Sequence, residues 1–259
     1  MSGEIYVDSF AALLPEGIIG PQGLRPWDQD QSGPRDVRRD QILDKPYVNF
    51  GKLMLADRLA FGAASIALSK SAIIEKETMA IALGIPAGSL STDLRYIESV
   101  QAGFPSPAIF SATLPSSAIA DIAIYFGIKG QNRVLAGNGA SGLSALEQAC
   151  MLLKLRKATS VLWCCVTAVD LQDIHNPLLY ASLASQCASC AIVLSSRPRE
   201  NATGIRISTS FQTASASSVV SGDELYFNEL FQLLINQKTG SLHCASCDVV
   251  ATLSLEKDG

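Results

Sequence analysis

The 259-residue chain has few charged side chains, few aromatic side chains and only two histidines. Charged residues make up 17% of the sequence and the net charge is −4, so nucleic-acid binding has no electrostatic support. The longest apolar run, 161–166, is far shorter than the roughly 20 residues that span a bilayer. The first residues show no basic segment followed by an apolar one, so we expect no signal peptide and a cytoplasmic protein with no membrane partner.

Apolar residues make up 48% of the sequence, which is enough to bury a sizeable core. The small charged fraction indicates that a partner covers some apolar surface, because monomers rarely expose large apolar patches. Seven cysteines are present, and in a cytoplasmic chain they are expected to be free thiols or ligands rather than disulfides.

Segments with strand character alternate with segments of helical spacing, which predicts an α/β fold with a mixed sheet packed between helices. The expected strands are 5–14, 79–83, 133–136, 160–169, 189–194 and 204–210, with a final hairpin over 241–255. The expected helices are 53–69, 93–101, 118–126, 143–157 and 223–234, and Pro105 and Pro107 interrupt the chain between two of them. We expect one domain over 1–212 and a short tail over 213–259 that packs on it, with 213–221 as the linker.

The stretch 133–149 carries the strongest local signal, an apolar strand that runs through a glycine-rich turn into a helix of small residues. Gly137, Gly139 and Gly142 match the G-x-G-x-x-G pattern, and Asp170 ends the next strand. This context is typical of dinucleotide-binding oxidoreductases. Alternatively, the glycines only let helix and strand pack closely. The turn contains no Cys, His, Lys or acidic residue.

Two C-x-x-C pairs, Cys187 with Cys190 and Cys244 with Cys247, lie far apart in the chain, and His243 adjoins the second. Such pairs can form a tetrahedral zinc site. Cys190 runs directly into a predicted strand, however, and residues three apart on a strand point to opposite faces. We therefore expect no metal and interpret these cysteines as small buried apolar residues.

Ser141 is a conceivable nucleophile, but a serine nucleophile needs a base. The two histidines, His175 and His243, lie in no recognisable catalytic motif. We expect Ser141 to bond local backbone near the helix start instead.

The segment 20–40 has no period, and we expect an exposed loop there. From Arg25 to Asp40 it mixes charges of both signs around Trp27, which is usual for a solvated loop. Alternatively, Trp27 and the arginines anchor a partner, because both residue types are frequent in interface hot spots.

Four further segments occur in a fixed order: 110–116, F-S-A-T-L-P-S; 126–132, F-G-I-K-G-Q-N; 140–142, A-S-G; and 186–194, Q-C-A-S-C-A-I-V-L. Over roughly 53–212 the chain thereby resembles the N-terminal half of a β-ketoacyl synthase of the thiolase fold. The second segment resembles the F-G-x-x-G-P-N turn, and the third resembles the residues after the nucleophile in A-C-x-S-G. The last resembles the D-G-A-A-A-L-V-L strand.

The departures from the family pattern concern its chemistry. The cysteine nucleophile of the family falls on Gly139, and glycine has no side chain with which to form a thioester. Gln131 stands where proline is usual. The histidine motifs of the family belong to a C-terminal half that is absent here or reduced to a tail. The resemblance therefore implies no catalytic residue and no cofactor in this chain, and no condensation by the chain alone.

Ketosynthase-like proteins without the cysteine are chain-length factors of type II polyketide systems, and short forms that resemble only the N-terminal half accompany aryl polyene-type systems. The resemblance implies a heterodimer with an active ketosynthase, which would hold an acyl chain on an acyl carrier protein. The implied dimer strand is the one before the elbow, formed by Arg133, Val134, Leu135 and Ala136. The implied tunnel-lining residues are Phe110, Thr113 and Leu114. A homodimeric scaffold with a degenerate thiolase fold remains a further alternative.

Overall fold

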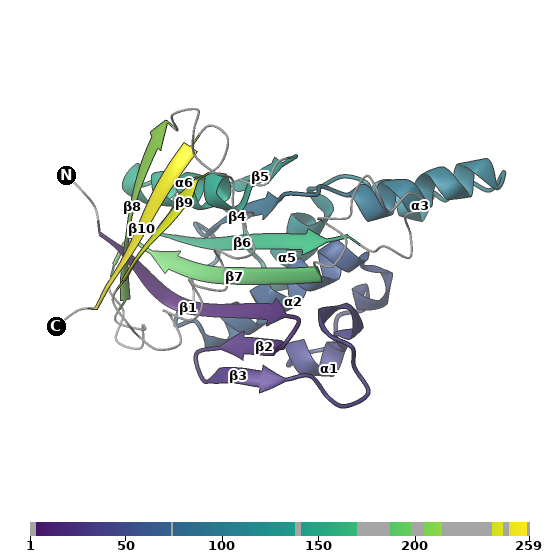
Figure 1. Cartoon of the computed structure of the whole chain (residues 1–259), viewed down its shortest axis with the longest axis horizontal. Helices are drawn as coiled ribbons and strands as arrows, with labels where there is room; N and C mark the ends of the chain where they lie inside the picture. Colours follow the sequence, from purple (N-terminus) through teal and green to yellow (C-terminus); the bar gives the residue numbers. More distant parts are fainter. Residues whose placement is uncertain are drawn as a thin grey trace.

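The computed structural model describes residues 4–73, 75–137, 141–169, 187–197, 205–213, 240–245 and 249–257. Strands within these ranges form one mixed sheet in the order β5-β4-β6-β7-β1-β8-β10-β9, with a hairpin of β2 and β3 attached to β1 (Figure 1). The strands are β1 (Ile5–Leu14), β2 (Gly17–Gly20), β3 (Gly23–Pro26), β4 (Ala80–Ile85), β5 (Asn132–Ala136), β6 (Ser160–Ala168), β7 (Cys187–Ser195), β8 (Ile205–Thr213), β9 (Gly240–Ala245) and β10 (Val249–Lys257).

The central strands are covered on both faces. β1, β4 and β6 are buried at every position, which explains why they read as almost continuous apolar runs rather than as alternating patterns. β5 and β6 flank β4 in parallel, whereas β7 runs antiparallel to both β6 and β1. The predicted mixed α/β sheet is confirmed.

Helices form a layer on each face of this sheet. The helices α2 (Leu55–Lys70) and α5 (Ser117–Phe126) pack with Leu162 and Val193 in one apolar cluster. The helix α6 (Ser141–Lys154) packs with Trp163 and Ile192 in the other. Successive residues of β6 and β7 thus enter opposite clusters, as strand geometry requires. The predicted helices 53–69, 118–126 and 143–157 are confirmed within a few residues.

The predicted loop over 20–40 is wrong at its start. β2 and β3 form a hairpin in which Gly17 pairs with Pro26 and Gly20 pairs with Gly23, across a turn of two residues. The remainder holds two short helical turns, η1 (Pro34–Asp36) and α1 (Arg39–Ile42), and the turn η2 (Phe50–Lys52) follows. Elements of three or four residues are too short to show a hydrophobic period, so the sequence pattern could not reveal them.

The helix predicted over 93–101 begins earlier, as α3 (Leu90–Gln101), and a short helix follows it, α4 (Pro107–Ser111). Pro107 opens α4, where a missing N–H costs nothing, and Ser106 caps it by accepting the N–H of Ile109 at 3.3 Å. Pro107 therefore starts a helix as well as interrupting the chain.

The predicted C-terminal hairpin is confirmed as β9 and β10. Ala245 pairs with Val250 at one end of this ladder, and Gly240 pairs with Leu255 at the other. β10 continues the sheet through β8, which runs to Thr213. The helix predicted over 223–234 and most of the linker predicted over 213–221 lie outside the described residues. Among the described helices, none has the length and apolar character needed to cross a membrane.

Candidate functional site

The strand β5 lies at one end of the sheet order. It pairs in parallel with β4, from Asn132 beside Ile81 to Ala136 beside Ile85, and within the described ranges no strand pairs with its other side. Val134 packs against the cluster of α2 and α5, whereas Leu135 packs against the cluster of α6. The strand is therefore anchored on both faces, and an edge that pairs with no other strand of the described part is a template for one from another chain.

Two glycines of the predicted F-G-x-x-G turn set the path from α5 into β5. Gly127 ends α5 with φ of 68°, a left-handed conformation that favours glycine. Gly130 donates its N–H to the carbonyl of Met79 at 2.9 Å, and a Cβ at this position would lie 2.1 Å from that oxygen. The motif thus fixes β5 beside β4 by direct backbone contact.

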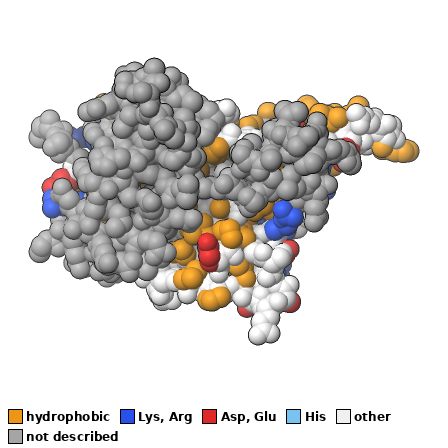
Figure 2. Space-filling model, in the orientation of Figure 1, with side chains coloured by type: hydrophobic (Ala, Val, Ile, Leu, Met, Phe, Trp, Pro, Cys, Tyr) orange, Lys and Arg blue, Asp and Glu red, His pale blue; other side chains and the backbone are white. Residues whose placement is uncertain are grey.

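The helices α3 and α4 and the turn that follows α4 form a projecting arm, residues 90–114. In Figure 1, α3 extends away from the body of the molecule, and Figure 2 shows apolar side chains along the same projection. Phe104 is 82% exposed and Leu114 is 61% exposed. Further exposed apolar side chains of the arm are Ile97, Val100 and Phe110. Scattered exposed apolar residues are normal, but five on one arm form a concentrated apolar surface.

The two helices of the arm contact each other. Tyr96 of α3 and Phe110 of α4 place their ring centroids 5.2 Å apart. Thr113 donates its hydroxyl to the carbonyl of Phe110 at 2.8 Å, which closes the turn after α4. The predicted tunnel residues Phe110, Thr113 and Leu114 therefore occupy one end of the arm, and Leu114 projects from it.

The turn between β5 and α6 spans residues 137–141, and the structure describes Gly137 and Ser141 but not residues 138–140. Gly137 has φ of 102°, and Gly139, the position of the family nucleophile, lies outside the described residues. A Cβ on Gly84 of β4 would lie 2.5 Å from Cα of Gly142, so helix and strand meet backbone to backbone. Ser141 is buried. The third glycine of G-x-G-x-x-G thus has a packing role, and the mixed sheet differs from the parallel sheet of dinucleotide-binding folds.

The register predicted for the first cysteine pair is confirmed. Cys187 packs in the cluster of α2, whereas Cys190 packs in the cluster of α6, on the opposite face of β7. Burial raises the pKa of the Cys164 thiol on neighbouring β6 well above its usual value. Cys244 lies on β9, but Cys247 and His175 fall outside the described residues. The buried free cysteines, Cys150, Cys164, Cys165, Cys187 and Cys190, therefore behave as apolar core residues.

The charged segment 25–40 forms ion pairs and hydrogen bonds within its own chain. Trp27 packs on the core and donates its indole N–H to the carbonyl of Leu14 at 2.8 Å. Arg38 forms ion pairs with Asp28 and with Asp30, the latter at 3.1 Å. Trp27 is thus engaged within its own chain, which favours the interpretation of a solvated segment over a partner anchor.

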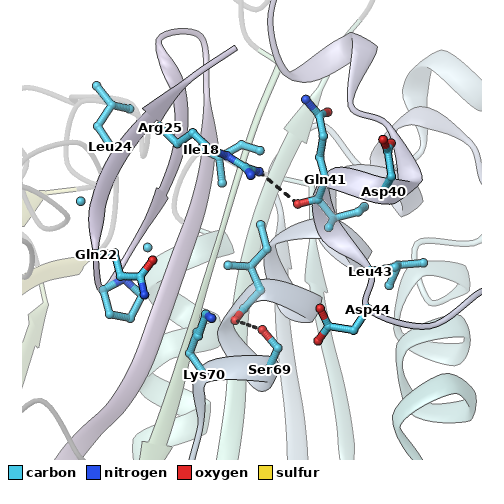
Figure 3. A pocket seen from close by; sticks show the side chains of 15 residues that line it. Ile18, Gln22, Leu24, Arg25, Asp40, Gln41, Leu43, Asp44, Ser69 and Lys70 are labelled. Carbon is cyan, nitrogen blue, oxygen red and sulfur yellow. Dashed lines mark hydrogen bonds between the residues drawn. The ribbon is translucent and has the colours of Figure 1, made fainter. Parts of the chain in front are cut away.

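This segment also forms one wall of a cavity of about 390 Å³ between the β2–β3 hairpin, α1 and the end of α2 (Figure 3). Arg25 crosses it to donate to the carbonyl of Gln41 at 3.1 Å. Lys70 faces the cavity from α2, and Asp40 and Asp44 lie on the opposite wall. Because side chains of both charges line this cavity, its electrostatics favour neither an anionic nor a cationic ligand.

Sequence reasoning missed a buried acidic group between α2 and α5. Asp57 accepts the hydroxyl of Ser117 at 2.8 Å, and Tyr47 bonds Asp121 beside them. Burial raises the pKa of Asp57 to about 6, although the Ser117 hydrogen bond lowers it, and the charge of Asp121 raises it further. The acid ties α2 to the helix that leads into β5, so it positions the candidate edge strand.

Asp57→Asn should increase stability most at high pH. The folded state holds a proton on Asp57 more tightly than the unfolded state, so ionisation at pH 8 destabilises the wild type by up to about 3 kcal/mol. That cost falls as the pH drops through 6 and disappears near 4. Urea unfolding at several pH values should therefore show an advantage for Asp57→Asn that shrinks on acidification. A constant difference between pH 4 and 8 would contradict this assignment.

Comparison with known proteins agrees with this architecture. The sequence model described as "Beta-ketoacyl synthase, N-terminal domain" matches residues 51–193. Comparison with curated protein sequences gave no match.

Solved structures with the same fold include ketosynthase complexes. The ishigamide ketosynthase/chain length factor has 15% identity and a TM-score of 0.71, covering 99% of this chain and 100% of the other. The ketosynthase (ApeO) in complex with its chain length factor (ApeC) from Xenorhabdus doucetiae has 12% identity and a TM-score of 0.65, covering 96% and 99%. AntDE:AntF, a type II PKS acyl-carrier protein in complex with its ketosynthase, has 11% identity and a TM-score of 0.70, covering 100% of both chains. The chain thus belongs to the β-ketoacyl synthase family and has the thiolase-like fold predicted for it.

Proposed function

We propose that this chain is the non-catalytic, chain-length-factor-like subunit of a heteromeric ketosynthase. It pairs with an active β-ketoacyl synthase and helps to shape the tunnel for an acyl chain in type II polyketide or aryl polyene biosynthesis. The acyl carrier protein reaches the chain through the complex. The observation that carries the proposal is the open edge of β5, anchored on both faces, beside an arm with exposed apolar side chains.

Pairing of β5 with its counterpart would satisfy the unpaired edge and continue one sheet through both subunits. The arm supplies apolar surface of the kind that a permanent interface buries. Leu114, exposed at the end of the arm, is the side chain proposed to approach the acyl tunnel. Arg133, Val134, Leu135 and Ala136 are the proposed dimer strand.

Co-expression with a ketosynthase encoded in the same gene neighbourhood tests this function. A 1:1 complex that elongates acyl chains, where this chain alone does not, supports the proposal. A stable homodimer that does not bind the ketosynthase would instead support a homodimeric scaffold, because the β5 edge can also pair with β5 of a second copy of this chain.

Gly139→Cys should not restore condensation in the isolated chain. The substitution supplies a thiol at the proposed nucleophile position, but no histidine motif of the family accompanies it in the sequence. Product analysis with malonyl- and acyl-loaded carrier protein should show no elongated chain for either the wild type or the variant. Elongation by Gly139→Cys without a partner would show that the chain contains its own condensing machinery.

A further inference from the structure

A second cavity, of about 250 Å³, lies at the amino-terminal end of α3, away from the cavity of Figure 3. The turn before α3, the first turn of α2 and the end of β6 line it, together with η1. Three of its described lining residues are arginines, Arg35, Arg58 and Arg95, and none of the described ones is acidic. They come from three separate segments, so the fold itself gathers the positive charge.

Two buried polar atoms on the wall of this cavity have no hydrogen-bond partner. They are the hydroxyl oxygen of Ser89 and Nε of Arg58, and both residues line the cavity. Ser89 is only 9% exposed. A buried polar group without a partner is destabilising, so two at one cavity favour a ligand that carries acceptor oxygens.

The helix α3 adds further donors. It is 12 residues long and begins directly after Ser89, whose side chain makes no capping hydrogen bond. The first N–H groups of a helix have no partner within the helix and carry the positive end of its dipole. Ser91 is committed elsewhere, because it donates its hydroxyl to the carbonyl of Ala168 at 3.2 Å. The cavity thus combines a helix amino terminus with a free hydroxyl and guanidinium groups.

Two of the three arginines make contacts that do not neutralise their charge. Arg58 donates to the carbonyl of Leu53 at 3.4 Å, and Arg95 contacts the sulfur of Met54 at 3.8 Å; both partners are neutral. The charges of Arg35 and Arg58 help to lower the pKa of the Asp36 carboxyl, after the larger effect of its hydrogen bonds from Ser32. Among the described lining residues, Arg58 and Arg95 thus bring two guanidinium groups to the cavity beside neutral partners.

We propose that this cavity binds a phosphate group. A phosphate offers several acceptor oxygens around one centre, which suits the fork of a guanidinium, a hydroxyl and helix N–H groups together. A carboxylate is planar and would satisfy fewer of these donors. The phosphate can come from free phosphate or from the phosphodiester of a pantetheine arm. The site does not depend on a partner ketosynthase, so it can be tested on the chain alone.

Isothermal titration with inorganic phosphate, at ionic strength held constant with chloride, measures the site directly. Arg95→Gln should weaken phosphate binding by roughly tenfold or more, because it removes a charge-assisted donor. Arg95 is exposed, so this variant should keep the fold. Arg39→Gln, with the same charge change on exposed α1, is the matched control and should bind like the wild type. Ser89→Ala removes the buried hydroxyl without a change of charge and should also weaken binding.

The same titration with 4′-phosphopantetheine distinguishes the two sources. Binding at least tenfold tighter than inorganic phosphate, and lost with Arg95→Gln, assigns the site to a pantetheine arm. Equal affinity for both probes, again lost with Arg95→Gln, assigns it to free phosphate. No measurable binding of either probe at millimolar concentration, or binding that Arg95→Gln and Arg39→Gln weaken equally, would overturn the proposal.

Discussion

Val134→Pro should abolish co-purification of this chain with its ketosynthase. Val134 lies at the middle of β5, opposite Leu83 of β4, and proline removes one backbone donor there and distorts the strand. If the cost resembles that of proline inside a helix, about 3 kcal/mol, binding becomes on the order of a hundredfold weaker. Pull-down with a tagged ketosynthase, followed by titration of the purified subunits, measures the effect.

Val134→Thr is the matched control, because it keeps the N–H and a β-branched shape. Circular dichroism should first show that Val134→Pro remains folded. Leu135→Pro extends the test. The backbone N–H groups of successive strand residues point to opposite edges of the strand. One of the two proline variants must therefore remove an N–H group from the edge of β5 that faces away from β4. If both proline variants fold and still co-purify normally, β5 is not the interface.

Leu114→Trp should preserve the complex but shorten its products. Leu114 is 61% exposed in the isolated chain, so extra bulk there disturbs no internal packing. At the proposed tunnel wall the larger side chain would fill space that a growing acyl chain needs, and elongation would stop earlier. Mass spectrometry of products released by the reconstituted complex measures the change.

Val48→Trp is the control for added bulk, because Val48 is 91% exposed and lies outside the arm. It should leave product length unchanged. If Leu114→Trp leaves product length unchanged while the complex stays active, Leu114 does not line the tunnel, and the chain-length role loses its main support.

The sequence predicted the elements that position the edge strand. The helix predicted over 118–126 is α5, and the strand predicted over 133–136 is β5 with one more residue at its start. Both segments are apolar, and the F-G-x-x-G turn joins them through backbone contacts that require glycine. Local sequence is sufficient where periodicity and turn residues agree on one structure.

The functional details that the sequence did not reveal depend on contacts between distant segments. In the sequence, Asp57 is an ordinary acidic residue of a predicted helix, next to Arg58. Its burial depends on a contact with Ser117, 60 residues later in the chain, which the local sequence does not show. Arg35 and Arg95 likewise meet in one cavity through the topology of the sheet rather than through a motif. A single sequence does not show which of its isolated charges will share a cavity.

The most direct test of the central claim is intact-mass spectrometry of the reconstituted complex after incubation with acyl- and malonyl-loaded carrier protein. We expect an acyl adduct on the ketosynthase subunit and none on this chain, in which Gly139 occupies the nucleophile position of the family. It also predicts elongated products only when both subunits are present. An acyl adduct on this chain, or elongation by this chain alone, would contradict the account.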